Sequence, residues 1–503
     1  MSGAWILGVD IGTYGSKGVL CAPDGRVLAK AEVEHGMSVP HPGWAEQDAD
    51  AVWWADFVHL ARTLASQAPP GGIGAVGVSA IGPCLLPLDA AGRPLRPGIL
   101  YGVDTRASRE VEELTDRIGV EHLLNVGGMT LSSQAVGPKI LWLKRNEPDV
   151  WSRTRSLLTA SSYLVFRLTG ERVMDTHTAS HYNPLFDLDG CRWSEGYGDL
   201  ADAVGLLPRL GWPNEVAGLV TPAAAAETGL AVGTPVAVGT VDAAAEALSV
   251  GVRAPGDMML MYGTTTFFIL VTPGPVRQRG MWSTAYCLPG TYDLAAGMAT
   301  TGALTRWFRD GLARDLREGG YATLTQEAEA VRPGSMGLVV LPYFSGERTP
   351  IQDPDARGVI AGLTLAHTRG HLYRALLEGT AYGVRHNLEA MERLGAEVRR
   401  VVAVGGGTRS RLWLQVVSDV TGVAQELPRQ TIGASYGDAF LAGWAAGMVP
   451  GLRALKQWTL PGETIEPDAG RVADYAPYYR IYRELYEASA SQCHALAELG
   501  RHG

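Results

Sequence analysis

A short pattern that occurs twice, once in each half of the chain, constrains the fold most strongly. Residues 4–9 form an apolar run that leads to a Gly-Thr turn at Gly12-Thr13, and a second apolar run follows at 18–22. The same order returns at 258–267, where Gly263-Thr264 lies 251 residues after Gly12-Thr13. Apolar runs on both sides of a tight turn are typical of β-hairpins, and a repeat spaced by half the chain indicates two related lobes.

The residues after the first hairpin predict alternating strands and helices. A Pro-Asp-Gly turn at 23–25 leads into a third strand through Val33, so the opening is an antiparallel meander. Apolar residues then recur at helical spacing from Asp48, and another apolar strand spans 73–81. This alternation predicts an α/β fold.

A second internal repeat predicts a pair of small-residue helices. Residues 242–251 (DAAAEALSVG) and 438–447 (DAFLAGWAAG) both begin with Asp-Ala and end with Gly. Helices lined with Ala and Gly can approach closely, so we expect them to cross at an interface between the lobes. Taken singly, each is also typical of an ordinary alanine-rich core helix.

Length and composition limit the function classes. A chain of 503 residues holds two or three domains, and we place the boundary near residue 248, which gives lobes at 1–248 and 249–503. The net charge of −9 argues against nucleic acid or anionic membranes as partners. The five widely spaced cysteines are typical of reduced thiols, and no apolar run is long enough to span a membrane. We therefore expect a cytoplasmic protein.

The two Gly-Thr turns suit a polyphosphate, because such a turn exposes backbone N–H groups and a hydroxyl while glycine lets an anion approach. In the first hairpin Thr13, Ser16 and Lys17 supply donors, and Asp10 at the strand end suits Mg²⁺ held through a water. The alternative is a turn aspartate that bonds its own backbone, next to a solvated lysine.

Asp242 opens the first small-residue helix after a strand at 235–239, a position that suits a general base for a hydroxyl. The alternative role for this carboxylate is a helix N-cap. In the second half, an apolar strand at 401–404 runs into Gly405-Gly406-Gly407-Thr408, where backbone can pack against a planar base.

Two motif matches fail in context. The G-x-G-x-x-G match at 72–77 precedes a strand instead of following one. The G-x-S-x-G match at 433–437, around Ser435, lacks a preceding hydrophobic strand, so a serine esterase is a weak alternative.

With these motifs together, the chain resembles the FGGY carbohydrate kinases over nearly its full length. The segments that resemble family signatures are 10–13, 42–48, 99–106, 137–143 and 358–378. The resemblance implies an α/β fold of two actin-like (ribonuclease H-like, ASKHA) lobes with a nucleotide cleft between them. It implies ATP, Mg²⁺ and a small sugar as ligands, with sugar binding, the first phosphate loop and the base in the N-terminal lobe, and the second phosphate loop and adenosine in the C-terminal lobe.

The resemblance also assigns roles to single residues. Asp242 is the expected catalytic base. Asp10 and Asp242 are the residues expected near Mg²⁺. The expected nucleotide-binding residues are Gly12, Thr13, Ser16, Lys17, Gly263, Thr264, Thr265, Gly406, Gly407, Thr408 and Arg411. The expected sugar-binding residues are Trp44, Gly82, Pro83, Tyr101, Asp104 and Asp242.

The acceptor sugar is the open part of this prediction. Ile81-Gly82-Pro83-Cys84 stands where xylulokinases have Met-His and glycerol kinases Arg-Glu, and Tyr101 stands where many members have Trp. Overall similarity favours a ketose such as D-xylulose, with glycerol, ribulose and gluconate as alternatives. An actin- or Hsp70-like ATPase that acts on a protein partner is the alternative from another class, and a homodimer is the candidate assembly.

Overall fold

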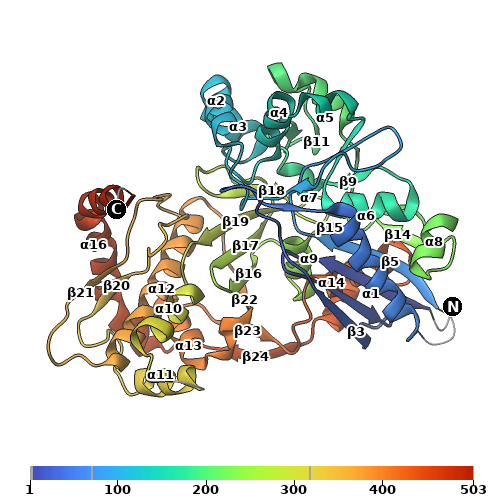
Figure 1. The fold of residues 1–503 in the computed structure, drawn as a ribbon. Helices are drawn as coiled ribbons and strands as arrows, with labels where there is room; N and C mark the ends of the chain where they lie inside the picture. Colours follow the sequence, from blue (N-terminus) through green and yellow to red (C-terminus); the bar gives the residue numbers. More distant parts are fainter. Residues whose placement is uncertain (1–3, 69–71, 317–318, 502–503) are drawn as a thin grey trace. The chain divides into compact units, whose positions relative to one another are not determined.

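The computed structural model describes residues 4–68, 72–316 and 319–501 (Figure 1). They form two compact units, each assembled from separate stretches of chain. The first unit comprises 1–254, 271–293 and 430–460, and the second comprises 255–270, 294–429 and 461–503. The division of roles between 1–248 and 249–503 stays a prediction, and the compact units add two later segments to the first half.

A mixed sheet forms the core of the first unit, with parallel strands in its middle and antiparallel pairs toward both edges. Its strands lie in the order β13 (Val216–Leu219), β14 (Pro235–Ala237), β5 (Ile73–Ala80), β1 (Trp5–Ile11), β2 (Gly15–Cys21), β3 (Val27–Glu34), with β15 (Thr240–Val241) also beside β5. The meander β1–β2–β3 confirms the predicted opening, and β1, β14 and β15 run parallel to β5. The carboxyl ends of β1, β5 and β15 therefore meet at one edge of the sheet.

The two faces of this sheet are covered by different helices (Figure 1). On one face α1 (Ala55–Ala65) packs Leu60 and Leu64 over Gly18, where a side chain would collide with them. On the other face α14 (Ala434–Ala445) lies directly on β1 and β5, and α9 (Asp242–Ser249) packs beside it. Alternate residues of each strand face these two sides.

The pair α9 and α14 is the predicted pair of small-residue helices. A Cβ on Gly437 would lie 2.1 Å from the carbonyl oxygen of Ala245, so the two backbones touch. Both helices belong to the first unit, however, so the expectation that they cross between two lobes is wrong. The sequence cannot reveal this, because α14 is drawn to the first sheet by contacts with β1 and β5, more than 350 residues earlier in the chain.

The rest of the first unit surrounds this core. Its other elements are β4 (Glu46–Gln47), the π-helical turn Ala49–Trp54, β6 (Leu86–Leu88), β7 (Gly98–Ile99), α2 (Ser108–Ile118), α3 (Val120–Gly127), α4 (Val136–Asn146), α5 (Pro148–Arg153), β8 (Ser156–Leu158), α6 (Ala160–Thr169), β9 (Val173–Asp175), α7 (Thr176–Ser180), β10 (Phe186–Asp187), β11 (Arg192–Trp193), the 3-10 helix Gly198–Leu206, β12 (Arg209–Gly211), α8 (Pro222–Thr228), β18 (Trp282–Ala285), the 3-10 turn Leu452–Ala454 and α15 (Leu455–Trp458). Helices α2 and α4 pack together around a second apolar cluster.

The second unit repeats the arrangement of a hairpin and a parallel strand. Its strands follow the order β19 (Tyr292–Met298), β17 (Thr266–Thr272), β16 (Asp257–Tyr262), β22 (Arg400–Val404), β23 (Gln425–Pro428), β24 (Pro461–Ile465). β16 and β17 form the predicted hairpin, and β22 runs parallel to β16 as β5 does to β1.

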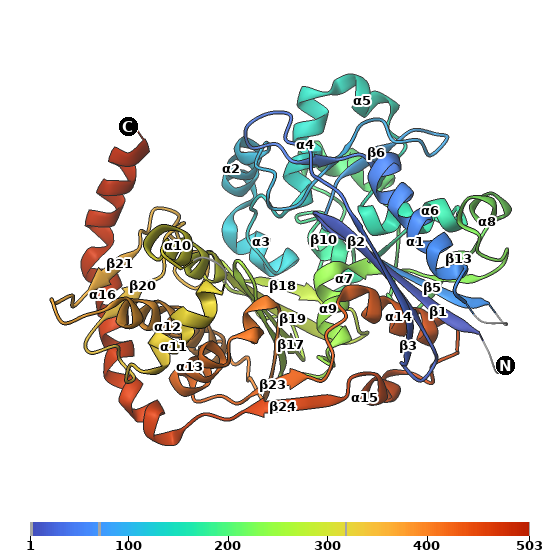
Figure 2. The same ribbon diagram turned by 60° about the horizontal axis from the view of Figure 1, so that its bottom comes forward.

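Helices pack around this second sheet (Figure 2). They are α10 (Gly302–Leu312), α11 (Gly320–Glu329), α12 (Arg369–Arg393), the 3-10 turn Gly406–Arg409, α13 (Arg411–Thr421) and α16 (Ala469–Arg501), with a small ribbon of β20 (Val339–Leu341) and β21 (Val359–Ala361). The long α16 packs against α13, α12 and β20. All five cysteines are free thiols, as predicted. Among the described residues, no helix is both long enough and apolar enough to span a bilayer.

Candidate active site

The loops that follow β1, β5 and β15 carry most of the residues predicted for the first lobe. Ile11 pairs with Ala80, and Ala80 with Val241, so Gly12-Thr13, Gly82-Pro83 and Asp242 follow strand ends that lie side by side. A Cβ on Gly82 would lie 3.1 Å from a methyl of Val241. The carboxyl edge of parallel strands is where α/β proteins place their ligands.

Tyr101 joins this group from a distant loop. Its hydroxyl forms a hydrogen bond of 3.0 Å with the hydroxyl of Thr13, and Gln47 donates to the carbonyl of Thr13. Burial raises the pKa of Tyr101, and the negative charge of Asp242 adds to this effect. The predicted phosphate turn, Tyr101 and Asp242 are therefore neighbours in the first unit.

Asp104 and Trp44 belong to a cluster of interacting side chains next to Tyr101, which we call the wall. The Asp104 side chain is 0% exposed, accepts from the Ala45 amide at 2.7 Å and forms an ion pair with Arg106. The Arg106 guanidinium in turn stacks 4.0 Å from the ring of Trp44. The structure thus encloses the Asp104 side chain and commits its oxygens to protein donors, and its predicted role in sugar binding stays a prediction.

Lys139 lies in segment 137–143, which resembles a family signature, and it stabilises the same wall. Its ammonium group is buried and donates to the carbonyls of Leu100, Tyr101 and Ser133 at 2.6–3.1 Å. Burial lowers the pKa of Lys139 to about 8. All three ammonium protons are used, so Lys139 orders the chain around Tyr101.

Asp242 is the first residue of α9. Val241 occupies the N-cap position, and one oxygen of the half-buried Asp242 carboxylate accepts from the Ala243 amide at 2.7 Å. Asp242 is therefore not the N-cap of α9, the alternative role considered for it. Burial raises the pKa of Asp242 well above its ordinary value, and the charge of Asp10 raises it further. A carboxylate with a raised pKa is a stronger base toward a hydroxyl proton.

Asp10 ends β1 on the face of the sheet that α14 covers. Burial raises its pKa to about 6, while a hydrogen bond from Ser79 and the charge of Lys17 lower it. The described residues contain no cluster of three or more His, Cys, Asp and Glu side chains arranged for a metal. Two neighbouring carboxylates still fit Mg²⁺, because this ion is commonly bound by one or two carboxylates, waters and substrate phosphates.

Ser16 and Lys17 face opposite sides of the sheet. Lys17 pairs with Asp10 in the β1–β2 register and is exposed. Ser16 is fully buried on the α1 side, where its hydroxyl donates to Asp56 at 2.7 Å. Strand alternation directs Ser16 away from the Asp10 face, so the structure does not bring it together with the other residues predicted to bind nucleotide.

The residues predicted for the nucleotide in the second half line a cavity of about 780 Å³ within the second unit. Gly263, Thr264, Gly406, Gly407 and Arg411 contribute to its walls. Thr265 lies in the same turn as Gly263, and Thr408 lies in the 3-10 turn, where its hydroxyl donates to Gly405. Arg411 begins α13 and forms an ion pair with Glu463.

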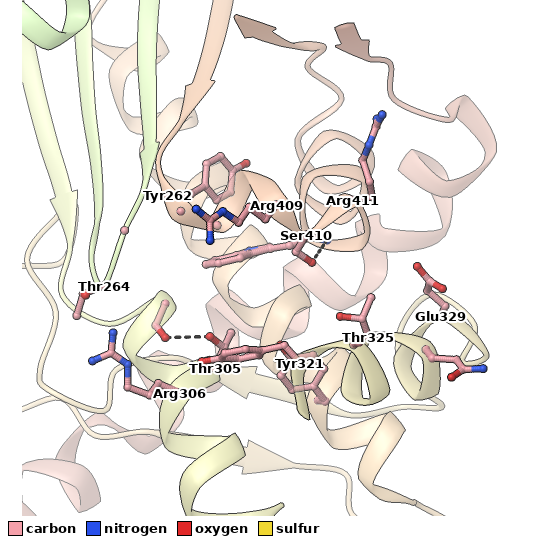
Figure 3. Close-up of a pocket in the computed structure, with 18 residues that line it drawn as sticks. Tyr262, Thr264, Thr305, Arg306, Tyr321, Thr325, Glu329, Arg409, Ser410 and Arg411 are labelled. Atoms are coloured by element: carbon pink, nitrogen blue, oxygen red, sulfur yellow. Dashed lines mark hydrogen bonds between the residues drawn. The ribbon is translucent and has the colours of Figure 1, made fainter. Parts of the chain in front are cut away.

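Two helices that no motif indicated complete this cavity. In Figure 3, Thr305 and Arg306 of α10 and Tyr321, Thr325 and Glu329 of α11 face Arg409 and Ser410 across the space. Sequence reasoning missed these residues because α10 and α11 have the amphipathic pattern of any surface helix. Ser410, which lies opposite these helices, caps α13 by accepting from the Trp413 amide.

The two Gly-Thr turns expose their amides in the same way. The amides of Gly302 and Ala303 donate to the carbonyls of Gly263 and Thr264, which fixes the second turn. In the described part of the chain, the amides of Thr264 and Thr265 have no acceptor, and neither have those of Thr13 and Tyr14 in the first turn. Both turns can therefore donate to an anionic oxygen.

The G-x-S-x-G match does not form a nucleophile elbow. Ser435 lies in the first turn of α14, is 2% exposed, and packs its carbonyl oxygen against Gly8 of β1. A serine in this position is closed to an ester substrate.

Comparisons with known proteins assign both halves of the chain to domains of one family. The N-terminal domain of the FGGY family of carbohydrate kinases matches residues 5–249, and the C-terminal domain of that family matches residues 258–446. A xylulose kinase of Escherichia coli (strain K12) is 31% identical over 96% of this chain and 98% of the relative. A glycerol kinase of Nocardia farcinica is 30% identical over 97% of this chain and 99% of the relative.

Solved structures agree with this grouping. The crystal structure of a xylulose kinase from Rhodospirillum rubrum has a TM-score of 0.91 to this chain at 33% identity, covering 97% of this chain and 100% of the other. The two-lobed α/β architecture of this chain is therefore the one found in that structure.

Proposed function

Since the chain belongs to the FGGY family of carbohydrate kinases, and so is an ATP-dependent sugar kinase, we propose that it phosphorylates a neutral ketose, with D-xylulose as first choice. We further propose that Asp242 takes the proton from the acceptor hydroxyl. The observation that carries the proposal is the meeting of Gly12-Thr13, Gly82-Pro83 and Asp242 at one sheet edge, with Tyr101 bonded to Thr13.

In the proposed mechanism the protein positions ATP and the acceptor sugar and supplies charged groups beside the reacting atoms. The exposed amides of the two Gly-Thr turns bind phosphate oxygens, and the cavity of the second unit binds adenosine. Asp242 accepts the proton of the acceptor hydroxyl while the oxygen attacks the terminal phosphorus and ADP leaves. Asp10 and Asp242 would hold Mg²⁺, whose chemistry is to neutralise charge on the phosphates.

The charged side chains around Tyr101 favour a neutral sugar over an aldonate as the phosphate acceptor. Lys139 and Arg106 contact the segment around Tyr101, but Lys139 is committed to three carbonyls and Arg106 to Asp104 and Glu46. An aldonate would therefore bring its carboxylate beside Asp242, while Lys139 and Arg106, the two cations that contact this segment, are already committed to protein groups, which costs free energy. This argument supports a ketose or a polyol over gluconate.

The experiment is a panel of acceptors at equal concentration: D-xylulose, D-ribulose, glycerol and D-gluconate. ADP formation is followed with and without each acceptor, and the phosphorylated product is identified by mass spectrometry. We expect the highest kcat/KM for a ketose and the lowest for gluconate. Preference for gluconate would refute the charge argument, and preference for glycerol would refute the ketose assignment.

A further inference from the structure

A buried carboxyl group on α14 has no role in the mechanism above. Asp438 is 1% exposed, and α14 reaches the first sheet from a segment that is far from β1 and β5 in the sequence. Its Oδ1 atom is buried without a hydrogen-bond partner in the described structure. A buried aspartate is costly unless something requires it there.

Two glycines bring this carboxyl group to the sheet. A Cβ on Gly8 would lie 1.9 Å from the carbonyl oxygen of Ser435, and a Cβ on Gly77 would lie 2.1 Å from that of Asp438. Only glycine at both positions lets the backbone of α14 rest on β1 and β5. Gly8 and Gly77 are paired, and two residues further along each strand Asp10 pairs with Ser79 on the same face.

The Ser79 hydroxyl lies between two carboxyl groups. Its Oγ is 2.9 Å from Asp10 Oδ1 and 2.7 Å from Asp438 Oδ2, both at hydrogen-bond distance. A hydroxyl carries one proton, so it can donate to only one of these oxygens. The second bond requires a proton on one of the carboxyl groups, and that group then donates to Ser79.

Asp438 is the group that holds this proton. It is enclosed by protein, and burial together with the charge of Asp10 raises its pKa well above the ordinary value. Asp10 is only partly buried, and Lys17 lies opposite it in the β1–β2 register, so its anion is better solvated and better compensated than an anion at Asp438 would be. The bonds therefore run from the Asp438 acid to Ser79, and from the Ser79 hydroxyl to Asp10.

We propose that Asp438 is a positioning residue, which through Ser79 fixes the orientation of the Asp10 carboxylate toward a divalent cation. The inference rests on the proposed function, because that function gives Asp10 its part in holding Mg²⁺. Ser79 occupies one Asp10 oxygen from the protein side and leaves the other to face the ligand. Such outer partners commonly set the affinity of a metal site.

The test measures Mn²⁺ binding directly, by electron paramagnetic resonance, in the full-length protein saturated with ADP. Mn²⁺ prefers the same oxygen ligands as Mg²⁺. The variants are Asp438→Leu, Asp438→Asn and Ser79→Ala. The matched control is Ser16→Ala, which removes an equally buried serine-to-aspartate bond on the opposite face of the same sheet. Thermal unfolding of each variant reports stability separately.

We expect Mn²⁺ affinity to fall about tenfold in Asp438→Leu and Ser79→Ala, the lower end of the effect of losing an outer partner. Asp438→Asn should stay within about threefold of the wild type, because its amide can still donate to Ser79. Ser16→Ala should lower the unfolding temperature without changing Mn²⁺ affinity.

Wild-type Mn²⁺ affinity in both Asp438→Leu and Ser79→Ala would overturn the proposal, as would an equal loss in Ser16→Ala. Should Asp438→Leu fail to fold, Ser79→Ala decides alone. A wild-type protein that binds Mn²⁺ with ADP but phosphorylates no acceptor would refute the proposed function, and the ranking of the variants would still test the role of Asp438.

Discussion

Asp242 has the position and the environment of a base, at the start of α9 and half-buried beside Asp10. We predict that Asp242→Asn lowers kcat for sugar phosphorylation by about 100-fold or more, because the amide keeps the shape but cannot accept a proton. Binding of an ATP analogue, measured by calorimetry, should change little.

The matched control for this variant is Glu246→Gln, one turn later on the same helix. Glu246 is also half-buried near Asp10, and burial raises its pKa to about 7, but it lies one turn further into α9 than Asp242, which directly follows β15. It should keep most of the wild-type kcat. Equal turnover in Asp242→Asn and the wild type would show that Asp242 is not the base.

His35 supports the first Gly-Thr turn in a way that depends on pH. Its Nδ1 lies 2.7 Å from Asp56 Oδ2 and its Nε2 lies 2.9 Å from the carbonyl oxygen of Gly12. Both nitrogens can donate only in the imidazolium form. The hydrogen bond with Asp56 raises the pKa of His35, with the bond to Gly12 adding to it.

Because the folded pKa of His35 lies above its unfolded value of about 6.5, its contribution to stability is complete below that pH and is lost as pH rises through the folded pKa. We predict that the difference in unfolding temperature between the wild type and His35→Gln is largest below about pH 6.5 and shrinks as the pH rises above this value through the folded pKa. A difference that is constant across this range, measured by calorimetry in buffers of equal ionic strength, would contradict the imidazolium assignment.

The sequence predicted which residues belong to the candidate site better than it predicted which way their side chains point. Gly12, Thr13, Asp10 and Asp242 were singled out, and the structure brings them to one edge. Ser16 could not be distinguished from Lys17, because a shift of one residue along a strand moves a side chain to the other face. Ser79 carries no motif, Asp438 stands out only as the first residue of the second small-residue repeat, and their meeting depends on how α14 docks.

At the scale of elements, the contact between the β16–β17 turn and α10 carries a prediction. A Cβ on Gly302 would lie 2.3 Å from the carbonyl oxygen of Gly263, so Gly302→Ala must displace the turn or the helix. Overpacking of this kind costs about 1–3 kcal/mol, and we expect KM for ATP to rise about tenfold while KM for the sugar stays near the wild-type value.

The control is Gly311→Ala in the same helix, where an added Cβ meets nothing within 4 Å. This change should leave both KM values unaltered and raise the unfolding temperature slightly, because alanine favours helix more than glycine does. An equal rise of both KM values in Gly302→Ala would mean that the turn does not serve the nucleotide.

The hairpins were predictable because apolar runs on both sides of a Gly-Thr pair are a local signal, and the structure contains both. The docking of α14 onto β1 and β5 was not, because it depends on the two paired glycines Gly8 and Gly77. The cavity of the second unit was predicted only from its turns and Arg411, since α10 and α11 contribute to it through spatial proximity alone.

At the scale of the whole molecule, the repeat in the sequence predicted two lobes, and each compact unit contains a hairpin flanked by a parallel strand. The segments 271–293 and 430–460 return to the first unit, which no local pattern indicates. The choice of sugar follows from no local pattern either, because Ile81-Gly82-Pro83-Cys84 matches the motif of neither the xylulokinases nor the glycerol kinases.

The central claim is that this chain transfers phosphate to a sugar instead of hydrolysing ATP to move a protein partner. The most direct measurement is the ratio of ADP formed to sugar phosphate formed with D-xylulose, in the wild type and in Asp242→Asn. The account predicts one sugar phosphate for each ADP, little ADP without an acceptor, and loss of both products in the variant. ADP formation that is equally fast with and without every acceptor of the panel would contradict it.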